Sequence, residues 1–173
     1  MLKNLNIEIE EVIRFLSLRI PNSKEDSRKS ILFHDIRVGT YLYEKNYSKD
    51  IILAWFLHDI LEWTGIDKQT IENEFGNNIL KLILANSKDD SIIDEEEKIN
   101  ELIMRCVQNW QDALIIKTAD IIDSFKWYSN QINNKELLYC TRNANAIFKF
   151  KPDNFNDKIF DDLEFWVNNN GLS

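Results

Sequence analysis

Both histidines of this 173-residue chain directly precede an aspartate, and each His-Asp pair lies next to an apolar segment. The pairs are His34-Asp35 and His58-Asp59, and a further aspartate, Asp120, closes another apolar run much later in the chain. Two imidazoles and two carboxylates are ligands that suit one divalent transition-metal ion with positions left open for water. The sequence therefore predicts a metal site formed by these histidines, Asp59 and Asp120.

The adjacency of His58 and Asp59 constrains how such a site could form. Neighbouring side chains on a regular helix point about 100° apart, so both reach one ion only where it lies over the helix at a crossing with other helices. His34 would then come from a preceding helix and Asp120 from a later one. A structural histidine and a surface aspartate at a helix end are the alternative interpretations.

The elements that position these residues are predicted to be helices. Four glycines and two prolines in the whole chain argue against a turn-rich β-fold and against a glycine-rich phosphate loop. The length fits one domain. We predict an all-α bundle of about seven to nine helices over residues 1–173. Asp67 is expected to cap one helix, and Ser48 or Asp50 another. Apolar spacing places these helices near 7–19, 29–44, 51–62, 68–75, 77–86, 95–109, 112–129, 134–149 and 155–168.

Charge and the chain's apolar runs limit the partners. A net charge of −8 and a sequence pI of about 4.8 argue against nucleic-acid binding. A small anion can still bind where a metal and a few basic residues make the site locally positive. No apolar run approaches the roughly 20 residues of a membrane span, and the first ten residues lack the apolar core of a signal peptide. With Cys106 and Cys140 read as buried thiols, we expect a cytoplasmic protein that binds neither nucleic acid nor membrane.

Several motifs together resemble a known family. The order His…His-Asp…Asp resembles the HD-domain metal-dependent phosphohydrolases. More narrowly, His58-Asp-Ile-Leu-Glu-Trp-Thr64 followed by Thr70-Ile-Glu-Asn-Glu-Phe-Gly76 resembles the hydrolase domain of RelA/SpoT-type proteins and small alarmone hydrolases, where HD-x-x-E-D-T precedes a short helix ending in Phe-Gly. The resemblance covers about residues 25–128, and its further segments are Arg28-Lys-Ser30, His34-Asp-Ile-Arg-Val38, Asn86-Ser-Lys-Asp89 and Ile116-Lys-Thr-Ala-Asp120.

The resemblance implies a metal and a catalytic carboxylate. One ion, Mn²⁺ first among the candidates, would be bound by His34, His58, Asp59 and Asp120. Glu62 matches the family's catalytic glutamate, which positions or deprotonates the attacking water. It falls four residues after His58, which on a continuous helix is one turn away on the same face. A solvated helix carboxylate is the alternative interpretation of Glu62.

The resemblance also suggests residues that contact the substrate. Arg28 and Lys29 match positions that contact the base or ribose in alarmone hydrolases, while Arg37 and Lys117 could each reach a phosphate. Surface or structural ion pairs are the alternative for all four residues.

Two positions depart from the family pattern. Trp63 stands where the alarmone hydrolases have an aspartate, and it could stack on a nucleobase or fill the core. Ser124 stands where they have an asparagine near the substrate's phosphates, and Asp123 adds a negative charge there. These departures favour a less anionic substrate than ppGpp.

The leading hypothesis is thus a metal-dependent phosphohydrolase acting on a phosphoester of a small nucleotide, with (p)ppGpp 3′-pyrophosphohydrolysis as one form of it. The alternative is a non-catalytic HD-fold sensor of nucleotide or metal, or a protein-interaction module. The aromatic-rich C-terminal segment is expected to form core, or a contact in a homo-oligomer.

Overall fold

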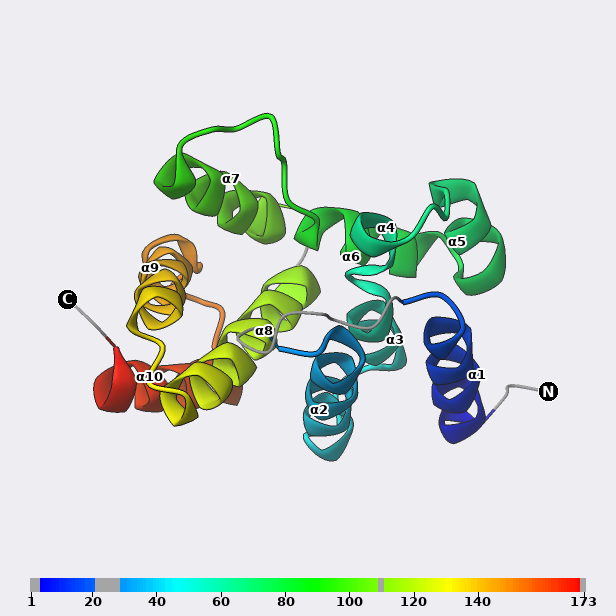
Figure 1. Cartoon of the computed structure of the whole chain (residues 1–173), viewed down its shortest axis with the longest axis horizontal. Helices are drawn as coiled ribbons and strands as arrows, with labels where there is room; N and C mark the ends of the chain where they lie inside the picture. Colours follow the sequence, from blue (N-terminus) through cyan, green and yellow to red (C-terminus); the bar gives the residue numbers. More distant parts are fainter. Residues whose placement is uncertain (1–3, 21–28, 109–110, 172–173) are drawn as a thin grey trace. The chain divides into compact units, whose positions relative to one another are not determined.

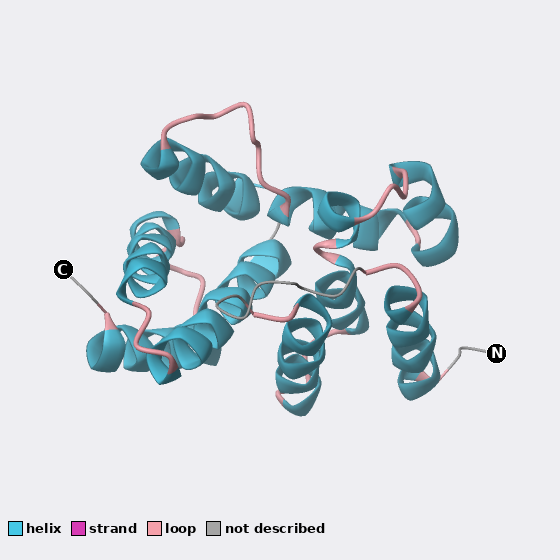
Figure 2. Cartoon of the chain, in the orientation of Figure 1, coloured by secondary structure: helices cyan, strands magenta, loops and turns pink. Residues whose placement is uncertain are grey.

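The computed structural model describes residues 4–20, 29–108 and 111–171, which form ten helices and no strand (Figures 1 and 2). The prediction of an all-α protein is confirmed. The helices are α1 Leu5–Ser17, α2 Ile31–Glu44, α3 Lys49–Leu57, α4 Ile60–Trp63, α5 Lys68–Phe75, α6 Asn77–Asn86, α7 Glu95–Gln108, α8 Gln111–Asn130, α9 Asn134–Phe150 and α10 Lys158–Asn170.

The chain divides after Ser87 into two compact units. Unit 1 comprises residues 1–87 and contains α1 to α6, and unit 2 comprises residues 88–173 and contains α7 to α10. In unit 1, α3 packs against α1, α2 and α6, and α5 packs on α6. In unit 2, α8 packs against α7, α9 and α10. The single domain expected over residues 1–173 stays a prediction.

Helix α3 is the core element of unit 1. Every residue from Ile51 to Leu57 is buried, as expected for a helix that is apolar on all sides. Ser48 begins this helix, because its side chain accepts a hydrogen bond from the backbone N–H of Ile51. Each large side chain fully buried here contributes about 1.5–3 kcal/mol relative to exposure, so α3 anchors the residues that follow it.

The chain turns at His58-Asp59, where the sequence predicted a continuous helix over 51–62. Helix α3 ends at Leu57 and α4 begins at Ile60. The backbone N–H of His58 bonds to the carbonyl of Trp55, and that of Glu62 to the carbonyl of Asp59, each three residues back. These tighter 3₁₀-type turns replace the regular spacing of four. The two candidate ligands therefore lie in a turn and are released from the 100° spacing of a helix.

Gly39 sets how closely α2 approaches α3. A Cβ atom built at Gly39 would lie 2.2 Å from Cζ of Phe56, a ring that is only 2% exposed. No real side chain fits there without displacing the ring or the helix. Because α2 carries His34 and α3 leads into His58, this contact positions one candidate ligand relative to the other.

We expect Gly39→Ala to lower the free energy of unfolding by about 1–3 kcal/mol, because overpacking of a filled core costs that much. The loss should appear although alanine gains about 1 kcal/mol in helix propensity. Urea denaturation measures it. Gly65→Ala is the matched control, since nothing lies within 4 Å of a Cβ there; equal midpoints for the two variants would contradict the packing argument.

Buried sulfur and aromatic side chains complete the core of unit 2. Cys106 and Cys140 are buried thiols, as predicted, and burial raises the pKa of the Cys106 thiol to about 12. Phe155 and Phe160 are buried, whereas Phe165 is 60% exposed. The homo-oligomer contact expected in this segment stays a prediction.

No helix within the described ranges combines the length and the apolar character needed to cross a bilayer.

Candidate metal centre

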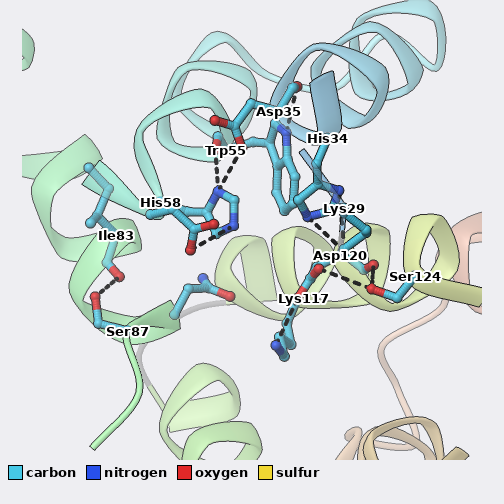
Figure 3. A network of polar contacts seen from close by, with 12 residues as sticks. Lys29, His34, Asp35, Trp55, His58, Ile83, Ser87, Lys117, Asp120 and Ser124 are labelled. Atoms are coloured by element: carbon cyan, nitrogen blue, oxygen red, sulfur yellow. Dashed lines mark hydrogen bonds and ion pairs between the residues drawn. The ribbon is translucent and has the colours of Figure 1, made fainter. Parts of the chain in front are cut away.

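Unit 1 gathers four polar side chains around the turn between α3 and α4. His34 and Asp35 come from the first turns of α2 (Figure 3). His58 and Asp59 form the turn itself. Both histidines are buried, and their ring centroids are 6.0 Å apart. Two helices that are nearly adjacent in sequence therefore bring the two imidazoles into one region.

The hydrogen bonds of His58 indicate which of its nitrogens can bind a metal. Its Nδ1 lies 2.7 Å from the backbone carbonyl of Trp55, so Nδ1 carries the proton and donates it. Its Nε2 lies 3.3 Å from Oδ1 of Asp59. Two ligand atoms in neighbouring positions on one ion are about 3 Å apart when each is about 2.1 Å from the metal. The His58-Asp59 pair therefore has the donor types and spacing that fit a single divalent ion.

Trp55 contacts both imidazoles. Its indole stacks on His58 with ring centroids 4.0 Å apart and an interplanar angle of 21°. It meets the ring of His34 edge-on at 5.1 Å. Trp55 is fully buried in the core, and sequence reasoning missed its contacts with the two histidines. The spacing of three residues between Trp55 and His58 was a signal, because residues three apart on a helix are neighbours.

The predicted basic residues near His34 are only partly described. Nζ of Lys29 lies 3.0 Å from Nε2 and 3.4 Å from Nδ1 of His34. Arg37 is half-buried, three residues after His34 on α2. Arg28 lies outside the described residues. The substrate-binding roles of these three residues stay predictions, and Lys29 touches the candidate metal ligand His34.

Glu62 and Trp63 lie on the single-turn helix α4, directly after the candidate ligands. Glu62 is exposed, and Trp63 is 44% exposed. Trp63 therefore does not fill the core, a role that Trp55 has. The same-face relation of Glu62 to His58 assumed a continuous helix, which the turn interrupts. The catalytic role of Glu62 stays a prediction that now rests on its place as the third residue of α4.

In unit 2, Asp120 is held by its neighbours on α8. Nζ of Lys117 lies 2.8 Å from Oδ2 of Asp120. The hydroxyl of Ser124 donates to the backbone carbonyl of Asp120 at 2.8 Å and lies 3.5 Å from Oδ1. Burial by itself lowers the pKa of Lys117, but the Asp120 carboxylate outweighs it and leaves the pKa above its usual value. Lys117 is thus charged at neutral pH. Lys117 and Ser124, both predicted to contact the substrate, each bind Asp120 instead.

The structure places three of the predicted metal ligands, His34, His58 and Asp59, in unit 1, but the ligand atoms that lie within 4.8 Å of one another come from Asp35, His58 and Asp59. Asp120 lies in unit 2. Sequence reasoning missed Asp35, which is fully buried, with Oδ1 3.8 Å from Nδ1 of His58.

Comparison with known sequences finds one informative relative. The chain is 24% identical, over 135 residues, to the guanosine-3′,5′-bis(diphosphate) 3′-pyrophosphohydrolase of Aquifex aeolicus (strain VF5). The match covers 75% of this chain but only 19% of that enzyme, so the chain corresponds to a small part of it. No family model matches the chain.

Two solved structures share the fold. One is a metazoan ortholog of SpoT described as hydrolysing ppGpp, with a TM-score of 0.77, 17% identity, and coverage of 100% of this chain and 99% of the other. The second is lmo0812 of Listeria monocytogenes EGD-e, with a TM-score of 0.66, 18% identity, and coverage of 78% and 93%. The resemblance drawn from the motifs is confirmed, and at these identities the structures establish the fold.

Proposed function

We propose that this chain is a metal-dependent phosphohydrolase that acts on a phosphoester of a small nucleotide. The observation that supports it most is the His58-Asp59 turn, in which Nε2 and a carboxylate oxygen are 3.3 Å apart beside a second imidazole. The relatives add support, because the sequence is similar to that of a ppGpp pyrophosphohydrolase. A solved structure described as hydrolysing ppGpp shares the fold.

The proposed ligands are His34, His58, Asp59 and Asp120, for one divalent ion. Neutral imidazole and carboxylate admit several metals, and Mn²⁺ is our first choice among them. The bound ion would supply Lewis-acid activation of water and of a phosphoryl oxygen. Asp120 enters the set through the Ile116–Asp120 motif, and its ion pair with Lys117 fixes the carboxylate in one orientation.

Glu62 is the proposed general base. A carboxylate near a reacting water can accept its proton as the oxygen attacks phosphorus, and the departing oxygen then leaves with the electrons of the broken P–O bond. Glu62 follows the two adjacent ligands by three residues and is open to solvent. It can therefore reach a substrate that enters from solution.

The substrate class is proposed from Trp63 and the basic residues. A half-exposed indole beside the general base offers a stacking surface for a nucleobase. Arg28 and Lys29 are the proposed base or ribose contacts, and Arg37 and Lys117 are the proposed phosphate contacts. Ser124 stands where the alarmone hydrolases have an asparagine, and Asp123 adds a carboxylate nearby, which favours nucleotides less anionic than ppGpp. Two buried cysteine thiols fit a reducing compartment, and we propose the cytoplasm.

The test is release of phosphate and pyrophosphate, with Mn²⁺ present, from ppGpp, pppGpp and common nucleotides, with Asp59→Ala as the blank. We expect release that the blank lacks. Pyrophosphate from ppGpp would identify an alarmone hydrolase that tolerates Trp63. Release only from other nucleotides would make Trp63 and Ser124 specificity determinants.

The second candidate is a nucleotide sensor that keeps the fold without turnover. Trp63 favours it, because an aromatic side chain stands where the resembling family has a carboxylate that shares in proton transfer. Saturable nucleotide binding without product release, under several divalent ions, would support the sensor and contradict the hydrolase.

A further inference from the structure

Asp35 is a buried carboxylate beside the candidate metal ligands that none of the predicted roles uses. It is 0% exposed and lies on α2, directly after His34. A carboxylate removed from water is costly unless charges or hydrogen bonds compensate it. The imidazole of His58 is one group near enough to act on this carboxyl group, with Nδ1 3.8 Å from Oδ1 of Asp35.

The two nitrogens of His58 face different partners (Figure 3). On the Nδ1 side are the carbonyl of Trp55 at 2.7 Å and Oδ1 of Asp35 at 3.8 Å. On the Nε2 side is Oδ1 of Asp59 at 3.3 Å. One atom from each of Asp35, His58 and Asp59 fits within 4.8 Å of the others. Because Nδ1 is committed to the Trp55 carbonyl, the ion belongs on the Nε2 side, and Asp35 stands behind the ring.

Trp55 holds Asp35 and His58 in this relation. The indole N–H of Trp55 donates to the backbone carbonyl of Asp35 at 2.9 Å. The same indole stacks on the His58 ring, and Trp55 is itself fully buried. Asp35 on α2 is thus linked to the His58 imidazole in two ways. Its backbone carbonyl binds the indole that stacks on the ring, and its carboxylate lies near Nδ1.

We propose that Asp35 is a positioning residue that acts together with the Trp55 carbonyl to favour the Nδ1–H tautomer of His58 and strengthens Nε2 as a metal donor. A ligating imidazole gains basicity when its other N–H faces a carboxylate or carbonyl, and the loss of such a partner typically weakens metal affinity 10–100-fold. In a buried site the electrostatic effect of a carboxylate 3.8 Å away is stronger than in water. The inference rests on the proposed metal site at His58.

The first measurement is the tautomer of His58, by ¹⁵N–¹H NMR of the metal-free protein. The chain has two histidines, so His34→Gln assigns the signals of both. We expect Nδ1–H in the wild type and a shift toward Nε2–H, or a mixture, in Asp35→Asn, which keeps the shape of Asp35 and removes its charge. A structural role would lower the melting temperature without altering the tautomer.

The second measurement is the dissociation constant of Mn²⁺ by titration calorimetry. We expect Asp35→Asn to raise it 10–100-fold. Asp50→Asn, on the first turn of α3, is the matched control with the same change in net charge, and it should bind Mn²⁺ like the wild type. Asp35→Ser is the second variant if Asp35→Asn does not fold.

The outcomes separate this inference from the proposed function. No binding of Mn²⁺, or of other divalent ions, to the wild type would remove the metal site, and the inference with it. Wild-type binding combined with an unchanged tautomer and an affinity within twofold in the Asp35 variant would overturn the role of Asp35 alone. Nε2–H in the metal-free wild type would overturn it as well.

Discussion

Replacing Asp59 by alanine is expected to abolish Mn²⁺ binding and phosphohydrolase turnover together, while the protein stays folded. Asp59 offers the carboxylate oxygen 3.3 Å from Nε2 of His58, so its loss removes one of two adjacent donors. Its side chain is 22% exposed and makes no capping hydrogen bond to α4. The variant therefore loses no bond that the helix needs, and we expect its free energy of unfolding to change by less than about 1 kcal/mol.

Two measurements check the Asp59→Ala prediction. A bound ion stabilises by mass action, by about 2.7 kcal/mol at a concentration 100 times its dissociation constant, so Mn²⁺ should raise the melting temperature of the wild type and not of the variant. Asp50→Ala is the control: it removes an acidic residue from the first turn of α3 and should keep the metal response. Full activity in metal-stripped Asp59→Ala protein would refute the proposed site.

The second large effect is expected at Glu62. Glu62→Gln keeps size and hydrogen bonding but cannot accept a proton, so turnover should fall about 10²–10⁴-fold, the usual contribution of a general base. Because Glu62 is outside the proposed ligand set, the dissociation constant of Mn²⁺ should remain within a few-fold of the wild-type value.

Steady-state kinetics with saturating Mn²⁺, together with calorimetry on the same preparation, separates these effects. Glu74→Gln, an exposed glutamate on α5, is the matched control and should leave both quantities unchanged. An unchanged turnover in Glu62→Gln would mean that Glu62 is a solvent-exposed helix carboxylate with no catalytic role.

Local signals explain why so much of the helical framework was predictable. Asp67 accepts a hydrogen bond from the N–H of Thr70 and starts α5, and Ser48 starts α3. Such caps involve residues three apart and need no tertiary information. The break at His58-Asp59 differs, because the stacking on Trp55 and the approach of Asp35 from α2 accompany it. Propensity along the segment favours a continuous helix, so the turn could not be predicted.

The candidate site was predictable to the extent that residue type decides it. Imidazole next to carboxylate is readable in the sequence, whereas the complete burial of Asp35 is a property of the packing of α2 on α3. Lys117 and Ser124 give a different lesson. Lys117 lies three residues before Asp120 and Ser124 four residues after it, and these spacings indicate contacts along one helix face. The resemblance led us to predict contacts with the substrate, whereas the structure shows contacts with Asp120.

The stacking of Trp55 on His58 also gives the protein an internal optical probe. The two rings are 4.0 Å apart, close enough for the electronic state of the imidazole to affect the excited indole. Paramagnetic or redox-active ions quench nearby indole fluorescence, and Trp55 also lies against His34. Its emission should therefore change when an ion occupies the site, and comparison with a Trp55→Phe variant would isolate this signal from the other four tryptophans of the chain.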